Sequence, residues 1–166
     1  MATLYVHNTA AQSVDTYGVN WFATSFTTDS RVAVVKSFTH LLTKIGAPTG
    51  NAIVSLRATS VNNPTGSDLT SVTRAVNTIG TGQQNETFTL ATPYVLLPFT
   101  KYAIVFRLSA GDASNYVAWY RSTSDTFTGG NWSTSTNSGS SWTATSFDGD
   151  FRVDGYYQSG STAYFM

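Results

Sequence analysis

Short runs of alternating apolar and polar residues recur along the whole chain, separated by clusters of Gly, Pro, Asn, Asp and Ser. No stretch shows the period of an amphipathic helix. Residues that favour exposed helices are scarce, since Glu occurs once and Lys three times among 166 residues, whereas Ser and Thr together number 47. β-Branched and aromatic residues, which favour strands, are abundant instead. The chain is therefore predicted to be all-β.

About ten short strands are expected, at intervals of about 8–12 residues. They are Leu4–Val6, Asn20–Phe26, Arg31–Leu42, Ala52–Thr59, Ser71–Ile79, Glu86–Leu90, Tyr102–Leu108, Tyr116–Arg121, Trp142–Phe147 and Phe151–Tyr157. This number and spacing predict an antiparallel β-sandwich of jelly-roll type. The polar segment 122–141 is expected to be a functional or self-packed loop. Residues 1–157 are expected to form a single domain, followed by a C-terminal tail or arm at 158–166.

Composition and charge exclude several classes of protein. Only 11% of residues are charged, and nine basic side chains balance nine acidic ones. Binding to nucleic acid or to an anionic membrane surface requires an excess of basic residues, so neither partner is expected. The apolar runs are too short for membrane insertion, and no secretory signal is expected at the N-terminus. The absence of cysteine excludes disulfides and cysteine nucleophiles.

The sequence contains no catalytic motif that we can identify. It has neither an HExxH metalloprotease motif nor a GxSxG nucleophile elbow, and its histidines, His7 and His40, are far apart. His40 has the strand parity of Phe38 and Leu42, so a half-buried position is expected. We therefore expect no enzymatic activity and no cofactor.

Three aspartates form the only candidate metal site that we identify in the sequence. Asp148, Asp150 and Asp154 offer oxygens at alternate positions, which suits a hard cation such as Ca²⁺. Asp148-Gly149 is also a standard hairpin pair, and a calcium site needs more oxygens than this segment supplies. The turn interpretation requires no further ligands, so no metal site is predicted, and the three aspartates remain weak candidates.

Aromatic residues cluster in the C-terminal third, beside polar loops. Tyr116, Trp119, Tyr120 and Trp132 are the candidates for a carbohydrate platform, because the C–H face of a sugar packs on an exposed ring. Core packing is the alternative for most of them. The segment Ser135–Trp142 resembles the Asp-box turn of sialidase propellers, and we interpret it as a hairpin with a buried Trp142.

Several fragments in a fixed order resemble a known family. They are Leu42–Leu56, Pro64–Leu69, Leu96–Val105, Gly130, Ser135–Trp142 and Asp150–Val153. This order resembles the choice-of-anchor R domain, a β-sandwich of bacterial surface proteins and phage structural proteins, over about residues 19–157. Bacterial members usually carry an export signal and a C-terminal anchor, which are not expected here. The resemblance therefore implies a phage component, and it implies no catalytic residues.

These observations together predict a non-enzymatic virion structural protein, either a capsid decoration or a tail or fibre component. It would be assembled in the host cytoplasm and act by protein–protein adhesion, with itself as a homo-oligomer, for example a trimer, and with other virion proteins. The alternative is a carbohydrate-binding module or receptor-binding adhesin that uses the aromatic residues above, with glycans as partners. That alternative would be secreted or on the cell surface if a signal has been removed.

The C-terminal tail carries a further prediction. A polar Gly/Ser segment leads to Tyr164, Phe165 and Met166. Large apolar side chains are costly to leave in water. We therefore expect these three residues to anchor an intersubunit or capsid contact.

Overall fold

A computed structural model describes residues 1–159 of the chain. These residues form twelve strands and one 3-10 turn, η1 (Val76–Thr78), so the prediction of an all-β protein is confirmed. The strands are β1 (Ala2–His7), β2 (Gln12–Thr16), β3 (Trp21–Thr27), β4 (Ala33–Ile45), β5 (Asn51–Ser60), β6 (Asn63–Ala75), β7 (Gln84–Leu96), β8 (Lys101–Leu108), β9 (Tyr116–Arg121), β10 (Asn131–Ser135), β11 (Thr143–Thr145) and β12 (Phe151–Tyr157). Within the described part of the chain, no helix has the length and apolar character needed to cross a membrane.

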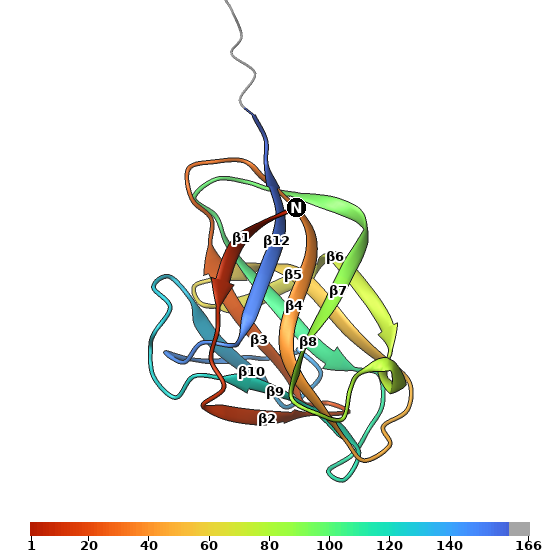
Figure 1. The fold of residues 1–166 in the computed structure, drawn as a ribbon. Coiled ribbons are helices and arrows are strands. Elements are labelled where there is room, and N and C mark those ends of the chain that lie inside the picture. The colour runs from red at the N-terminus through yellow and green to blue at the C-terminus, as the bar shows by residue number, and fades with distance from the viewer. Residues whose placement is uncertain (160–166) are drawn as a thin grey trace, which may run out of the picture.

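The strands form two antiparallel sheets that pack face to face (Figure 1). Sheet A has the order β1-β12-β4-β9-β2, with β7 also paired to β4, and sheet B has the order β11-β10-β3-β8-β5-β6. Within them, β1-β12-β4-β7 and β3-β8-β5-β6 have the strand order of the two sheets of a jelly roll. The predicted jelly-roll sandwich is therefore confirmed, and β2 and β9 to β11 are additions to it.

Strand β4 is shared between two pairs of strands. Over Ala33–Thr39 it pairs with β12, and over Leu42–Ile45 it pairs with β9, on the edge opposite β7. Strand β1 continues the sheet beyond β12, and β2 continues it beyond β9. Sheet A therefore divides beside Leu41, where β4 passes from one partner strand to the other.

The core lies between the two sheets, and alternating side chains of both supply it. Its largest fully buried members include Trp119, Trp132, Phe26, Phe38, Phe88, Phe106 and Phe151. Strand β8 is central in sheet B, between β3 and β5, and the apolar run that it contains is buried on both faces, as the sequence predicts. Its side chains at Ala103 and Val105 are as inaccessible as those at Ile104 and Phe106.

Some sequence-based boundaries are wrong, and the pairing explains why. The segment between the expected strands Ala52–Thr59 and Ser71–Ile79 belongs mostly to β6. Because β6 is an edge strand, it can contain Pro64, which has no N–H to donate to a neighbouring strand. The expected loop 122–141 contains β10, which pairs along β3. Strand β2 was not expected because its sequence is largely polar, yet it pairs with β9 at an edge of sheet A.

Candidate functional site

Two of the four aromatic residues predicted to bind a sugar lie in the core. Trp119 and Trp132 are 0% and 2% exposed, and their ring centroids are 4.8 Å apart. Trp119 Nε1 donates a 2.8 Å hydrogen bond to the backbone carbonyl of Asp150, which satisfies the one polar atom of the ring. A sugar requires an exposed ring face, so the prediction is wrong for both tryptophans.

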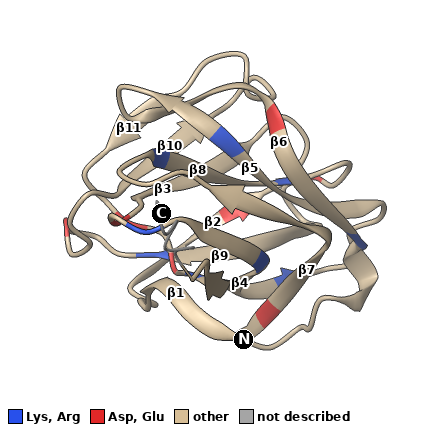
Figure 2. Cartoon of the chain, turned by 90° about the horizontal axis from the view of Figure 1, so that it is seen from above, with Lys and Arg blue, Asp and Glu red and all other residues tan. Residues whose placement is uncertain are grey.

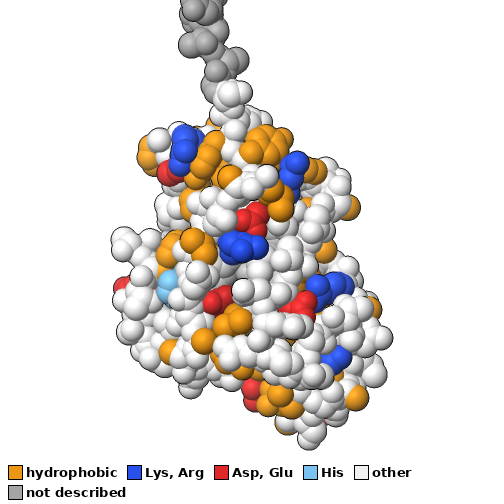
Figure 3. All heavy atoms as spheres, viewed as in Figure 1, with side chains coloured by type: hydrophobic (Ala, Val, Ile, Leu, Met, Phe, Trp, Pro, Cys, Tyr) orange, Lys and Arg blue, Asp and Glu red, His pale blue; other side chains and the backbone are white. Residues whose placement is uncertain are grey.

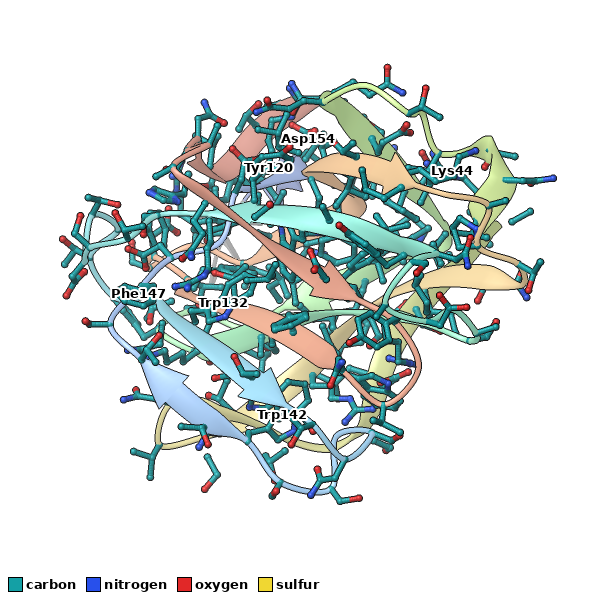
Figure 4. All side chains as sticks on the ribbon, turned by 90° about the horizontal axis from the view of Figure 1, so that it is seen from below. Lys44, Tyr120, Trp132, Trp142, Phe147 and Asp154 are labelled. Carbon is teal, nitrogen blue, oxygen red and sulfur yellow. The ribbon has the colours of Figure 1, made fainter. Side chains whose placement is uncertain are left out.

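The other two aromatic residues, Tyr116 and Tyr120, are half-buried and point to the opposite side of β9 from Trp119. Tyr116 packs against Tyr17, with ring centroids 6.4 Å apart. The Tyr120 hydroxyl lies 3.2 Å from Thr43 Oγ1. Figure 4 shows the labelled Tyr120 well apart from the labelled Trp132. The four predicted residues therefore do not come together as one platform.

The three candidate metal-binding aspartates hydrogen-bond to separate parts of the protein. Asp148 Oδ2 accepts hydrogen bonds from the N–H groups of Thr126 and Phe127, at 2.8 and 2.9 Å. Asp154 accepts from Thr3 Oγ1 at 2.9 Å and from Arg152 Nε at 2.8 Å. Among residues 1–159, no three His, Asp or Glu side chains group in a way that could hold a metal ion. These carboxylates fasten loops and strands to one another.

Asp150 has the most distinctive surroundings of the three. Its Oδ1 accepts from the N–H of Leu41 at 3.1 Å, and its Oδ2 accepts from the N–H of Thr9 at 2.8 Å. The carboxylate thereby bridges the division in sheet A, and burial raises its pKa although both backbone N–H groups oppose that shift. A hollow of about 390 Å³ opens at this point, lined by Asn8, Thr9, Leu41, Asn85, Asp150 and Arg152 among others.

A second polar cluster lies on sheet B and was missed at the sequence level. Asp68 binds two arginines, with Arg57 Nε at 2.7 Å from Oδ1 and Arg107 Nη2 at 2.6 Å from Oδ2. Both guanidinium groups lie over the ring of Trp21, at 5.7 and 4.8 Å from its centroid. Burial would raise the pKa of Asp68, but the two arginines lower it overall. The cluster is internally paired, so it stabilises the sheet rather than offering a free charge.

One end of the sandwich carries exposed apolar side chains, which we call the apolar end and define as Met1, Val95, Leu97, Phe99 and Tyr156. Tyr156 and Val95 flank Val34 in one row across β12, β4 and β7. Figure 1 places the start of β1, the β7–β8 connection and the end of β12 together, and Figure 3 shows hydrophobic side chains gathered there. The sequence signal was available, because Leu97-Pro98-Phe99 places two large apolar residues in a turn between strands.

Phe99 is the most unusual residue of the apolar end. It is 75% exposed, and its φ of 49° lies in the left-handed region that a bulky side chain rarely adopts. The turn is held there by hydrogen bonds from Phe99 N to the Asp29 carbonyl at 2.9 Å and from Thr100 N to Thr28 Oγ1 at 2.8 Å. The fold thus fixes an aromatic ring in solvent on a strained backbone.

The remaining predicted contact residues, Tyr164, Phe165 and Met166, lie outside the described residues. Charged residues of both signs are interspersed over the two sheets (Figure 2).

No protein-family model matches the chain, and no curated protein matches it in sequence. The protein is therefore classified by its fold alone, as a jelly-roll β-sandwich with added strands. Its distinctive surfaces are the apolar end and the hollow at Asp150.

Proposed function

We propose that the chain is a non-enzymatic structural protein of a virion, a capsid decoration or a tail or fibre component, that works by adhesion to further copies of itself and to other virion proteins. The observation that carries this proposal is the apolar end with its strained, exposed Phe99. The jelly-roll fold, which is common in capsid proteins, and the resemblance to the choice-of-anchor R domain support it.

A strained backbone that presents an aromatic ring to water, among the other exposed apolar side chains of the apolar end, is explained by a contact with another protein. A bulky residue at positive φ costs about 1–3 kcal/mol, and leaving the ring in solvent adds to that cost. Both costs are unnecessary for the fold, because Asn or Gly in the same turn would avoid them. Burial of Phe99 against a partner offsets them, and aromatic residues are enriched in such contacts.

A second copy of this chain is the partner that the surroundings favour. Asp29 and Arg31 lie beside Phe99 and form an exposed ion pair, with Arg31 Nη2 at 2.6 Å from Asp29 Oδ2. A surface that carries a positive and a negative side chain can pair with the same surface of a second copy across a twofold axis. The formal net charge of zero also removes the long-range repulsion between copies.

The oligomeric state of the full chain tests the proposal. Phe99→Asn removes the ring and suits the left-handed backbone, so we expect a shift from oligomer to monomer in analytical ultracentrifugation. At dilutions where the wild type is monomeric too, the melting temperature should be unchanged or higher. Val61→Asn is the matched control, because Val61 is 89% exposed at a φ of 56° in the β5–β6 turn, outside the apolar end. It should leave the oligomer intact.

A wild-type chain that is monomeric at about 100 µM would contradict the self-association, as would a Phe99→Asn oligomer identical to the wild type. The virion assignment has its own test. The chain should be found by mass spectrometry in particles purified from the cells that make it, at a copy number in integer ratio to the major capsid or tail proteins.

A further inference from the structure

The division of sheet A creates the hollow at Asp150. Strands β12 and β9 occupy successive parts of the same edge of β4, and Leu41 lies between the two pairings. The β1–β2 connection, residues 8–11, crosses from the β12 side to the β9 side, and Thr9 N binds Asp150 there. The hollow of about 390 Å³ is within the range of small-ligand sites.

Asp150 forms the floor of the hollow. It is only 5% exposed, yet it lines the hollow, and each of its oxygens accepts one backbone hydrogen bond. A carboxylate has about four lone-pair positions, so each oxygen retains capacity for another donor. Two N–H groups, one from strand β4 and one from the β1–β2 connection, fix its orientation, which provides a rigid acceptor.

The residues around Asp150 in the hollow supply hydrogen-bond donors, further acceptors and some apolar surface. Asn8 and Asn85 are exposed and enter from opposite sides, from the β1–β2 connection and from β7. Arg152 uses Nε on Asp154, while its side chain remains 43% exposed. Val6 and Leu41 add apolar surface beside these polar groups. The lining therefore mixes planar donors and acceptors with a small apolar area.

We propose that the hollow at Asp150 binds a neutral polyhydroxylated ligand, a single saccharide unit of a glycan. Carboxylate, carboxamide and guanidinium groups each make paired hydrogen bonds, which match vicinal hydroxyls. Val6 and Leu41 offer a surface for the C–H groups of the ring. Arg152 is paired with Asp154, so the carboxylate of Asp150 leaves the hollow with one negative charge, which disfavours a phosphate. Among residues 1–159 no three His, Asp or Glu side chains group to hold a divalent cation. Saccharide recognition here does not use the four aromatic residues of the sequence-based prediction.

A glycan array screened with the full chain, followed by isothermal titration calorimetry with the free oligosaccharide that binds best, tests this site. Asn8→Ala and Asn85→Ala, both at exposed positions, should each weaken binding at least about tenfold without a change in melting temperature. Asn77→Ala is the matched control, since Asn77 is an exposed asparagine in η1 that does not line the hollow. Its affinity should equal that of the wild type.

The proposal is overturned if no array glycan binds, or if the best ligand binds the Asn8→Ala and Asn85→Ala variants as tightly as the wild type. Asp150→Asn gives a second readout, because it keeps the shape but removes the charge; where its melting temperature is retained, affinity should fall. Phe99→Asn separates this proposal from self-association. It should bind the oligosaccharide with wild-type affinity per chain, so either proposal can fail alone.

Discussion

His40 on β4 is enclosed in the aromatic core rather than half-buried as its strand parity alone indicated. Its ring centroid is 4.7 Å from that of Trp119 and 6.3 Å from those of Phe88 and Phe106. Nδ1 lies 3.3 Å from the Asp150 carbonyl, which can only accept, so Nδ1 carries the proton. Nε2 is buried without a partner. A second proton there would have no acceptor, and burial lowers the pKa of His40 to about 4.

This depressed pKa predicts a pH dependence of stability. In the unfolded chain His40 titrates near 6.5, whereas in the folded protein it stays neutral until about pH 4. As the pH falls through this window the unfolded state takes up the proton first, so the free energy of unfolding falls, by up to about 3 kcal/mol. Urea titrations between pH 7 and pH 4 should show this loss, and His40→Gln should reduce it. Equal slopes for both proteins would contradict the assignment.

The tryptophans give a second prediction at the residue scale. Trp132 is fully buried between Trp119 and Phe22, so Trp132→Ala should lower the free energy of unfolding by about 3–5 kcal/mol. Trp142 was expected to be buried, but it is only half-buried beside Gly139 at the β10–β11 turn. Trp142→Ala should therefore cost clearly less. Chemical denaturation of the two variants side by side measures the difference, and equal losses would contradict it.

At the scale of elements, Glu86 connects the two sheets. It lies on β7 of sheet A, and its Oε2 accepts from Arg74 Nη2 of β6 in sheet B at 2.6 Å. Its Oε1 accepts from Gly80 N at 2.8 Å and from Gln84 Nε2 at 2.7 Å. Burial would raise the pKa of Glu86, but these donors lower it overall. The only glutamate of the chain thus closes one side of the sandwich.

Glu86→Ala should cost about 2–4 kcal/mol of unfolding free energy, because it leaves Arg74 and a backbone N–H without their partner in a mostly buried place. Asp29→Ala removes the exposed pair with Arg31 and should cost less than about 1 kcal/mol. Thermal and urea unfolding at pH 7 measure both. A Glu86→Ala variant as stable as Asp29→Ala would show that the connection contributes little.

Elements were more predictable from the sequence than surfaces were. Alternation located most strands, and the turn predicted within Ser135–Trp142 is present: Asn137 Oδ1 accepts from Ser141 N at 2.9 Å, and Gly139 has a φ of 79°. The direction of Trp119 and Tyr120 was not predictable, because both are large aromatic residues and alternation only requires them to point apart. The hollow arises from contacts such as Thr9 with Asp150, 141 positions apart, which no local pattern records.

At the scale of the whole described molecule, the added strands share the core of the jelly roll. Trp119 comes from β9 and Trp132 from β10, and both belong to the same buried cluster as Phe22 of β3 and Phe106 of β8. Their rings are in direct contact, with centroids 5.5 Å apart for Phe22 and Trp132 and 5.9 Å apart for Phe106 and Trp119. The additions therefore cannot separate without exposing the centre of the sandwich.

We accordingly expect one cooperative unfolding transition for both sheets and the added strands. Calorimetry should give an enthalpy of about 110 kcal/mol near 60 °C, equal to the van't Hoff value, and tryptophan fluorescence should report the same midpoint as far-UV circular dichroism. Self-association makes the midpoint depend on concentration, so the Phe99→Asn variant is the appropriate sample. An earlier fluorescence transition, with the far-UV signal retained, would mean that β9 to β11 melt first, and the shared core would then not couple the additions to the jelly roll.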